Sequence, residues 1–450
     1  MNRALLVDLY ELTMGQSYFV YHRRTYATFD LFVRNLPHNR SYLVVCGLED
    51  ILTYIKGLRF SDDDIAYLRS QKTFSEEFLS FLKRFRFSGD IWAMQEGEVC
   101  FAQEPILRVT APIIEAQFIE SFLLNTINLQ TMIASKAARV VDAACGRGVL
   151  DFSLRRTHGA EAGLHVARSS YIAGCRGTSN VLAGKLYGIP VAGTMAHSFI
   201  MSFKDEMSAF LAYGETFPRK TILLVDTYTT SKGIDHAVML GLHLKKKGFQ
   251  LQGIRLDSGD IVKLSKLARK KLDAAGLSFV KIFASGNLDE FKIHALLKRK
   301  AQVDSFGVGT NMGTSIDAPA LDVIYKISEV TDGFGNFLPT MKLSEGKQTF
   351  PGRKQVFRQS DRSGRFIKDV IGLETERIQG RPLLRNVVKQ GKVIYRVPKL
   401  DDIRSTAAKN IACLPKRMRA IESQAVFPVA VSPGLHKLCK GLAAQRAQRQ

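Results

Sequence analysis

The stretch "TILLVDTYTTSKGIDHAVMLGLHLKKKGFQLQGIRLDSGD", residues 221–260, decides the fold. An apolar strand over 221–228 is followed by a segment with apolar residues at helical spacing, and a second strand begins at 251. Both strands are apolar at nearly every position, which is typical of strands that are covered on both faces. A strand, a helix and a second apolar strand in succession predict a parallel βα unit.

The same plan recurs on both sides of this stretch. Strands are predicted over 148–154, 189–193, 278–289 and 303–310, with helices over 161–173, 177–188 and 261–276. One long amphipathic helix is predicted from residue 112, and short strands with glycine turns return after about residue 335. We therefore expect an N-terminal α/β domain over 1–115, a βα domain over 116–330 and a C-terminal segment, 331–450, that returns to the N-terminal domain and ends in a basic tail.

The composition is that of an ordinary globular protein, with 46% hydrophobic and 24% charged residues in 450. Acidic residues, Asp8 and Glu11, interrupt the apolar N-terminus, so it does not resemble a signal peptide, and no charge-free stretch is long enough to cross a membrane. The six cysteines are scattered without a CxxC pair. This pattern favours free thiols in the cytoplasm over a structural zinc site.

The net charge of +22 raises the alternative of nucleic-acid binding. The cations lie on predicted helical segments such as 244–248, 266–272 and 296–300, and basic patches interleaved with aromatic residues are missing. A basic surface that attracts anionic small molecules accounts for the charge equally well. Nucleic-acid binding is therefore the minor alternative.

Polar residues or glycines follow every predicted strand of the βα region. In parallel α/β folds the functional residues gather at this end of the strands, so the repetition predicts an active site there. The residues in question are Arg155 and Arg156; Thr194, His197 and Ser198; Asp226 and Tyr228; Arg255, Asp257, Ser258, Gly259 and Asp260; Ser285, Gly286 and Asn287; and Gly307, Gly309 and Thr310.

The residue types indicate an anionic, phosphate-bearing substrate. Arg155 and Arg255 can clamp a carboxylate or a phosphate, and the small-residue turns leave backbone N–H groups free for phosphate oxygens. Asp226 and Asp257 suit sugar hydroxyls, Mg²⁺ or the orientation of a histidine, although "LDSGD" also suits a helix N-cap. His197 is a candidate acid, base or nucleophile; alone, it would more simply be a turn residue.

One glycine-rich stretch is a false lead. "VVDAACGRGVLD" (140–151) superficially resembles the first motif of methyltransferases. The first glycine of that motif is replaced by alanine, and "VVDAAC" continues the helical pattern. Gly146 and Gly148 are therefore interpreted as a helix stop and a turn.

Seven stretches in order resemble the nicotinate phosphoribosyltransferase family from residue 4 to about 440. They are "LLVDLYELTMGQSYF", "ATFDLFVRNLPHNRSYLVVCGLED", "LDFSLRRTHG", "GTSNVLAGKLYGIPVAGTMAHSF", "IRLDSGD", "FGVGTNMGTS" and "KLSEGKQTFPGRKQVFR". The resemblance implies an irregular parallel β/α barrel with a second α/β, sandwich-like domain built from both ends of the chain. It also implies the transfer of phosphoribose from phosphoribosyl pyrophosphate to nicotinate, with Mg²⁺ and coupled ATP hydrolysis, in NAD salvage.

The resemblance also implies roles for individual residues. His197 resembles the family's phosphohistidine, and Asp226 would fix its ring tautomer. Phe152 would stack on the pyridine ring and Arg155 would meet its carboxylate. The remaining implied contacts are to base, ribose and 5′-phosphate, from Ser179, Asn180, Ser198, Arg255, Asp257, Ser258, Gly259, Ser285, Gly286, Gly307, Gly309 and Thr310. Asp8 and Tyr10 resemble residues that reach the neighbouring subunit's site, which implies a homodimer with shared sites.

Alternatives remain within and outside this family. Enzymes that use nicotinamide carry an aspartate in the segment that matches "GTSN", where this chain has Ser179 and Asn180. A relative that uses quinolinate would need more cationic side chains in the pocket and would not need His197. A catalytically inactive scaffold is disfavoured by the intact motifs "GTMAHS", "LDSGD" and "FGVGT".

Overall fold

The computed structural model describes residues 3–342 and 349–447 and divides the chain into two compact units. One unit consists of the residues up to 132, residues 320–420 and the residues from 424 onward. The other unit consists of residues 133–319 and 421–423. We describe each unit by itself, and we call the second the catalytic unit because it holds the candidate site.

A six-stranded sheet forms the centre of the catalytic unit, and all its strands pair in parallel. The order is β7 (Gly177–Thr178), β6 (Gly148–Asp151), β11 (Ser305–Val308), β10 (Lys281–Ala284), β9 (Gly253–Leu256) and β8 (Ile222–Leu224). Their C-terminal ends therefore lie at one edge of the sheet. Among the described residues β7 and β8 do not pair with each other, so hydrogen bonds do not close the sheet into a complete ring. This is the predicted parallel α/β arrangement.

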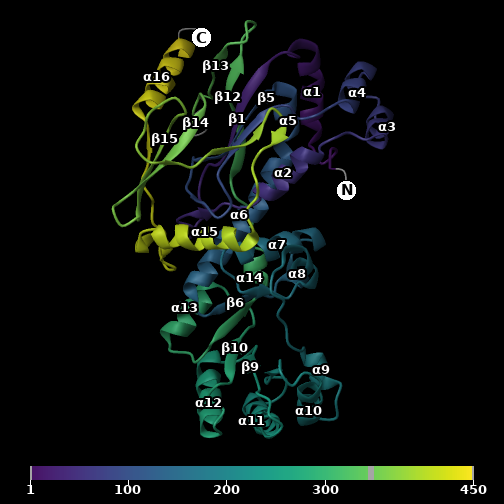
Figure 1. Cartoon of the computed structure of the whole chain (residues 1–450), viewed down its shortest axis with the longest axis vertical. Helices are drawn as coiled ribbons and strands as arrows, with labels where there is room; N and C mark the ends of the chain where they lie inside the picture. The colour runs from purple at the N-terminus through teal and green to yellow at the C-terminus, as the bar shows by residue number, and fades with distance from the viewer. Residues whose placement is uncertain (1–2, 343–348, 448–450) are drawn as a thin grey trace. The chain divides into compact units, whose positions relative to one another are not determined.

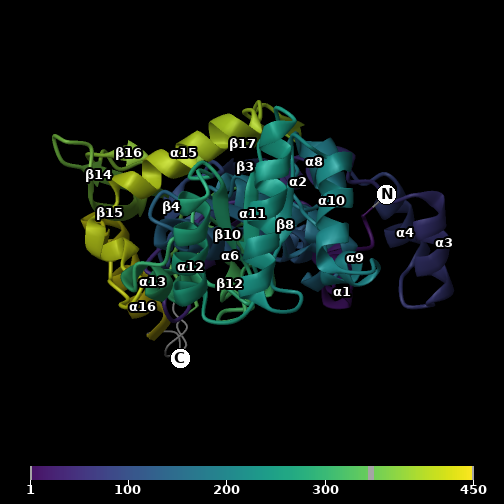
Figure 2. The same ribbon diagram turned by 90° about the horizontal axis from the view of Figure 1, so that it is seen from below.

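Helices connect the strands, and side-chain caps mark where several of them begin. The Asp260 carboxylate accepts hydrogen bonds from the backbone of Val262 and Lys263, which satisfies otherwise unpaired N–H groups at the start of α12. Helix α12 packs against β9, β10 and the neighbouring α11 (Figures 1 and 2). The helices of this unit are α7 (Ala160–Ile172), α8 (Val181–Tyr187), α9 (His197–Met201), α10 (Glu206–Thr216), α11 (Thr230–Lys246), α12 (Ile261–Ala274), α13 (Glu290–Lys298) and α14 (Thr310–Gly313), with a 3₁₀ turn at Leu154–Arg156.

Three predictions of local structure were wrong. Gly177 and Thr178, predicted as the start of a helix over 177–188, form strand β7, and α8 begins only at Val181. The stretch 189–193 is not a buried strand: it forms a single bridge between Val191 and Thr178, and Val191 is 52% exposed. Pro190 has no N–H group for a ladder, which limits pairing here. The long helix predicted from residue 112 is divided at Ile119 into α5 (Ile113–Phe118) and α6 (Glu120–Ala143).

The other unit is built on mainly antiparallel sheets that combine both ends of the chain, with one parallel pair, β15 and β19, in the smaller sheet (Figure 1). Strand β1 pairs on one side with β5 and on the other with β12, which follows residues 133–319 of the catalytic unit in the sequence. The seven-stranded sheet runs β13 (Phe337–Pro339), β12 (Val323–Thr331), β1 (Tyr26–Val33), β5 (Pro105–Pro112), β3 (Asp90–Ala93), β17 (Arg385–Lys389) and β18 (Lys392–Val393). The predicted fold class, with a second domain made from the two ends, is therefore confirmed.

A smaller sheet and several helices complete this unit. The smaller sheet runs β16 (Arg381–Pro382), β14 (Lys354–Ser360), β15 (Phe366–Leu373) and β19 (Val429–Val431), and β2 (Leu43–Val44) pairs with β4 (Val99–Cys100). The helices are α1 (Leu9–Tyr21), α2 (Leu48–Gly57), α3 (Asp62–Ser70), α4 (Glu76–Lys83), α15 (Leu400–Cys413) and α16 (Pro433–Ala447), with a 3₁₀ turn at Lys416–Arg419. Part of the motif at 342–358 and the end of the basic tail, residues 343–348 and 448–450, lie outside the described residues.

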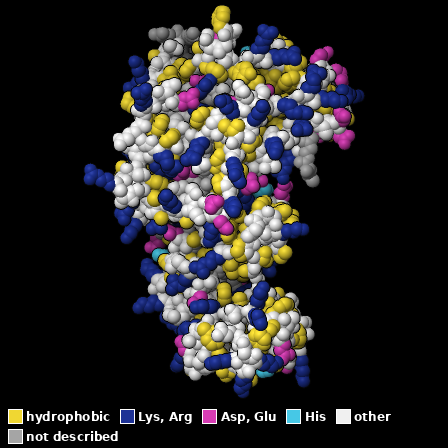
Figure 3. Space-filling model, viewed as in Figure 1, with side chains coloured by type: hydrophobic (Ala, Val, Ile, Leu, Met, Phe, Trp, Pro, Cys, Tyr) yellow, Lys and Arg dark blue, Asp and Glu magenta, His cyan; other side chains and the backbone are white. Residues whose placement is uncertain are grey.

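Lysines and arginines are spread across the visible face of the molecule in Figure 3. In the described ranges, no helix is both long and apolar enough to cross a membrane.

Candidate active site

A cavity of about 380 Å³ is lined by the parallel sheet and reaches the C-terminal ends of its strands. Phe152 after β6, Arg255 in β9, Ser285 after β10 and Gly307 in β11 all line it. Thr194, from the segment before α9, completes this polar end. The cavity thus brings together five of the predicted site residues, from segments that are distant in the sequence.

Arg255 donates hydrogen bonds to three side chains at this end of the cavity. Its Nε donates to Ser285 Oγ at 2.9 Å, its Nη1 to Thr194 Oγ1 at 2.9 Å and its Nη2 to Asp257 Oδ1 at 3.0 Å. The planar guanidinium therefore joins the ends of β9 and β10 to the segment before α9, which a lysine could not do with the same geometry.

Arg255 and its neighbours also favour the ionised form of the Asp257 carboxyl. Burial by itself would raise the pKa of the Asp257 carboxyl, but the Ser285 hydroxyl, Arg255 and the nearby His197 together lower it below its ordinary value. Ser285 Oγ donates to the Asp257 oxygen that also accepts from Arg255. The predicted helix N-cap in "LDSGD" is Asp260 rather than Asp257, so capping does not account for Asp257.

Asp226 lies at the end of β8 and holds the turn that follows β9. Its Oδ2 accepts from the Asp257 backbone N–H at 2.9 Å and from Ser258 Oγ at 2.7 Å. Its Oδ1 is buried and has no hydrogen-bond partner among the described residues. The expected hydrogen bond from His197 to Asp226 is therefore not formed in this structure, because the carboxylate is turned to the neighbouring turn.

His197 is the first residue of α9, and its side chain is half-buried. The ring Nδ1 lies 3.1 Å from Thr227 Oγ1. If Nδ1 carries the proton and donates it to the threonine, the lone pair lies on Nε2. Thr227, one residue after Asp226, is thus the neighbour that can set the ring tautomer, and sequence reasoning did not single it out.

Two glycines make room for Phe152. A Cβ atom at Gly307 would lie 2.6 Å from two ring carbons of Phe152, and one at Gly309 would lie 3.2 Å from the Phe152 carbonyl oxygen. The Phe152 ring can occupy its position in the cavity wall because residue 307 has no side chain. Gly307 therefore leaves space for the Phe152 ring, whereas the family resemblance groups Gly307 with the substrate-binding residues.

Asn180 has a structural position in the fold. Its Oδ1 accepts from the Ala183 backbone as the N-cap of α8, and its Nδ2 donates to the Gly163 carbonyl at 3.2 Å. The preceding residue, Ser179, donates its backbone N–H to the Asp151 carbonyl at 2.8 Å. Both polar groups of the Asn180 side chain are thereby used within the protein.

A buried carboxylate that sequence reasoning missed stands beside this segment. Asp151, at the end of β6, accepts hydrogen bonds from the Ser153 hydroxyl and from Thr178 Oγ1, the latter at 2.7 Å. Burial raises the pKa of the Asp151 carboxyl, although these hydrogen bonds act in the opposite direction. Asp151 fixes the start of the 152–156 turn against β7, and the only sequence signal for it was an acid inside an apolar strand.

The other predicted residues of the catalytic unit lie in the turns and helix starts of this unit, and none of them is among the described residues that line the cavity. Arg155 is exposed, in the 3₁₀ turn after β6, and has no ion pair in the described part of the chain. Gly286 has a φ of +92°, and a Cβ atom there would lie 1.8 Å from the Asp257 carbonyl oxygen, so this turn requires glycine. The remaining positions are Ser198 in α9, Ser258 and Gly259 in the turn before α12, and Thr310 at the start of α14.

Asp8 and Tyr10 belong to the other unit. Asp8 precedes α1, and its carboxylate accepts from Ser121 Oγ at 2.5 Å. Tyr10 is 48% exposed. Burial, together with the carboxylates of Glu120, Glu11 and Asp8, raises the pKa of the Tyr10 hydroxyl, so it remains protonated.

Comparison with known proteins decides the family. Residues 5–128 match the nicotinate phosphoribosyltransferase N-terminal domain, residues 148–334 the nicotinate phosphoribosyltransferase family, and residues 377–439 the corresponding C-terminal domain. The chain belongs to the nicotinate phosphoribosyltransferase family. Its predicted family and enzyme class are confirmed.

Relatives and solved structures agree over nearly the whole chain. A nicotinate phosphoribosyltransferase of Mycobacterium tuberculosis is 48% identical over 431 residues, which cover 95% of this chain and 91% of the relative. The enzyme of that name from Bacillus subtilis is 38% identical over 461 residues, covering 95% and 93%. The crystal structure of human nicotinic acid phosphoribosyltransferase has a TM-score of 0.86 at 28% identity and covers 97% of this chain and 99% of that one.

Proposed function

We propose that this family member transfers phosphoribose from phosphoribosyl pyrophosphate to nicotinate, giving nicotinate mononucleotide and pyrophosphate in NAD salvage. The observation that carries the proposal is the cavity, where Phe152, Arg255 and Ser285 meet at the C-terminal end of the parallel sheet. Phe152 offers an aromatic face for the pyridine ring. The strand-end turns and Arg255 offer donors for phosphate oxygens.

The side chains near the 179–180 segment favour nicotinate over nicotinamide. Both polar groups of the Asn180 side chain are used in hydrogen bonds, one that caps α8 and one to the Gly163 carbonyl. Ser179 has no carboxylate that could accept a hydrogen bond from the amide of nicotinamide. Arg155, in contrast, is a cation with no ion pair among the described residues. A substrate carboxylate would pair with Arg155, whereas a neutral amide would gain less from it.

Catalysis would rest on positioning and charge. Glycosyl transfer through an oxocarbenium-like ribose needs a nearby anion and a fixed leaving group. Asp257 remains ionised because Ser285 and Arg255 lower its pKa, so its negative charge is available at the ribose. The Ser285 and Gly286 turn, together with Gly309 and Thr310, would hold the 5′-phosphate.

ATP would enter as a second substrate through His197. Nε2 of His197 attacks the γ-phosphorus, the bond from phosphorus to the bridging oxygen breaks, and ADP leaves. Water later cleaves the phosphorus–nitrogen bond and releases phosphate, so one ATP is hydrolysed in each cycle. The hydrogen bond between Nδ1 and Thr227 supports this role because it can leave the Nε2 lone pair free.

The residues present fit a magnesium ion held jointly with substrate. No group of three or more His, Cys, Asp or Glu residues in the described ranges could hold a metal by itself. Asp226 Oδ1 is nevertheless a buried carboxylate oxygen without a partner, and Mg²⁺ is commonly bound by one or two carboxylates plus substrate phosphates. Bound there, Mg²⁺ would stabilise the charge of the departing pyrophosphate.

A twofold homodimer would complete the site. Apolar side chains of α8 are exposed, namely Val181 at 70%, Leu182 at 51% and Leu186 at 55%, beside the candidate site of the same unit. Tyr10 is exposed in the other unit and would reach the site of the partner subunit. Mixing inactive Tyr10→Ala and His197→Ala chains should then restore part of the activity, whereas verified mixed dimers without activity would refute shared sites.

The first experiment is product formation from nicotinate, phosphoribosyl pyrophosphate and Mg²⁺, with and without ATP, beside a parallel reaction with nicotinamide. We expect product from nicotinate and none from nicotinamide. The amount of product should rise when ATP is present. A folded sample that converts only nicotinamide, or neither base, would overturn the proposed function.

A further inference from the structure

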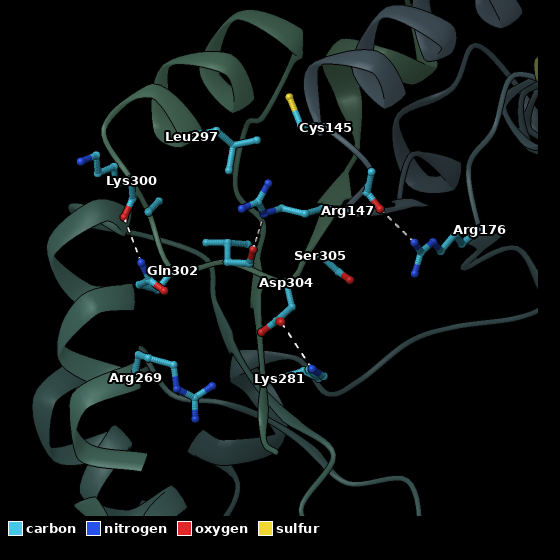
Figure 4. Close-up of a pocket in the computed structure, with 13 residues that line it drawn as sticks. Cys145, Arg147, Arg176, Arg269, Lys281, Leu297, Lys300, Gln302, Asp304 and Ser305 are labelled. Carbon is cyan, nitrogen blue, oxygen red and sulfur yellow. Dashed lines mark hydrogen bonds and ion pairs between the residues drawn. The ribbon is translucent and has the colours of Figure 1, made fainter. Parts of the chain in front are cut away.

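A second cavity, of about 920 Å³, lies at the opposite end of the parallel sheet in the catalytic unit. It is formed where β6, β7, β10 and β11 begin. The polar end of the candidate active site lies where the strands end, although its cavity extends along the sheet as far as Lys281, which lines both cavities. We call it the basic cavity because Arg147, Arg176, Arg269, Lys281 and Lys300 line it, together with a single carboxylate, Asp304. Figure 4 shows Arg147, Arg176, Arg269 and Lys281 around the hollow, with Lys300 at its rim and its side chain extending away from Arg147.

Three of the five cations have no compensating carboxylate. Arg269 donates to Asp273 at 2.9 Å and Lys281 lies 3.6 Å from Asp304, so these two are paired. The other three, Arg147, Arg176 and Lys300, have no ion pair in the part of the chain that the structure describes. Like charges that converge in a concave site raise the local potential and attract anions.

Backbone carbonyl groups hold the two arginines in place. Arg147 Nε donates to the Val303 carbonyl at 2.9 Å, and Arg176 Nη2 donates to the Gly146 carbonyl at 3.0 Å. These bonds orient each guanidinium without neutralising it, and further N–H groups on both remain for a ligand. In Figure 4 the two arginines approach from neighbouring elements, with the carbonyl of Gly146 joined to Arg176.

The glycine-rich stretch at 140–151 builds this wall of the cavity. Helix α6 ends at Ala143, and Cys145 and Gly146 follow with positive φ angles of 48° and 82°. Gly148 begins β6, and a Cβ atom there would lie 3.2 Å from Arg176 Cδ, so glycine lets Arg176 lie close to the strand. The helix stop predicted at Gly146 is confirmed, whereas Gly148, predicted as a turn, is the first residue of β6 and makes room for Arg176.

We propose that the basic cavity binds a small polyanion that carries several phosphate groups, at a site separate from the candidate active site. The uncompensated cations Arg147, Arg176 and Lys300 come from three different segments, which suits several phosphates better than one. Among the described residues no aromatic side chain lines the cavity, so they offer none of the stacking platforms of single-stranded nucleic-acid sites. A compact polyphosphate is therefore favoured over RNA.

The test uses the full chain and inorganic tripolyphosphate as the probe. The double variant Arg147→Gln/Arg176→Gln is compared by titration calorimetry with Lys245→Gln/Lys246→Gln, which removes the same charge from exposed positions on α11. We expect the first variant to weaken one class of tripolyphosphate site about tenfold or more, and the second to leave it unchanged. Because Cys145 is an exposed free cysteine at the cavity, tripolyphosphate should also slow its alkylation, mapped by mass spectrometry.

Equal weakening in both double variants, or alkylation of Cys145 that tripolyphosphate does not slow, would overturn the proposal. Neither arginine lies in the candidate active site, so retained phosphoribosyl transfer shows that the first variant is folded. If that variant fails to fold, Lys300→Gln replaces it, because Lys300 is exposed and its side chain has no partner in the described ranges. If a single-stranded RNA oligonucleotide binds only when both arginines are present, and tripolyphosphate does not displace it, the ligand of this cavity is a nucleic acid instead.

Discussion

Replacing Gly307 by alanine tests whether Phe152 forms the wall against which the pyridine ring binds. The new methyl group would lie 2.6 Å from two carbons of the Phe152 ring. Carbon atoms in contact are about 3.5–4.0 Å apart, so the ring must retreat by roughly 1 Å. The perturbation thus moves Phe152 without changing any polar or charged group of the site.

The expected loss of nicotinate affinity follows from the free energy that an aromatic contact contributes. Stacked or edge-to-face aromatic pairs contribute about 0.5–1.5 kcal/mol beyond their buried area, so nicotinate affinity should fall by about 2- to 13-fold. Overpacking the wall should also lower the free energy of unfolding by about 1–3 kcal/mol. The turnover number should fall further if the pyridine ring is misplaced, since productive geometry is sensitive to shifts of this size.

Calorimetry of nicotinate binding and steady-state kinetics measure these effects. Gly193→Ala is the matched control, because Gly193 lines the same cavity but a Cβ atom there meets nothing within 4 Å. Thermal unfolding of both variants shows that they remain folded. If Gly307→Ala binds nicotinate as tightly as Gly193→Ala does, Phe152 does not contact the base and the reasoning fails.

Four further predictions concern single side chains. His197→Ala should abolish ATP hydrolysis and ATP stimulation but leave slow transfer without ATP; undiminished hydrolysis would remove its proposed role. Arg155→Ala should weaken nicotinate binding by roughly 2–3 kcal/mol, and an unchanged affinity by calorimetry would count against the contact. Thr227→Val should slow ATP hydrolysis by about 2- to 13-fold, the value of one neutral hydrogen bond of about 0.5–1.5 kcal/mol, whereas Thr227→Ser should not; equal slowing in both variants would contradict the tautomer argument. Burial raises the pKa of Glu11 to about 8 from 4.5, so the folded state holds a proton that the unfolded state releases, and stability should fall as pH rises between these values. Denaturant unfolding of Glu11→Gln should show a weaker dependence over this range, and an identical dependence would refute the assignment.

The sequence by itself determined the parallel βα region and the end of the sheet that carries function. Apolar strands, amphipathic helices and glycine turns are local patterns, and they repeat along the chain with the spacing of βα units. Polar residues that follow each strand must meet at one edge, because parallel strands all end on the same side. Arg255, Asp257 and Ser285 could therefore be grouped from their positions in the sequence alone. The ordered motifs also sufficed to indicate the family.

Only the tertiary structure decided which partner each side chain takes. Whether His197 meets Asp226 or Thr227 depends on side-chain rotamers and on the turn after the neighbouring strand β9, and neither leaves a pattern in the sequence. The same holds for the pairing of β1 with β12, which brings together segments from opposite ends of the chain. The basic cavity likewise joins the loops before four strands, and no periodicity links Arg147 to Lys300. Such contacts depend on how the whole chain packs, because their free energy comes from groups that the sequence keeps far apart.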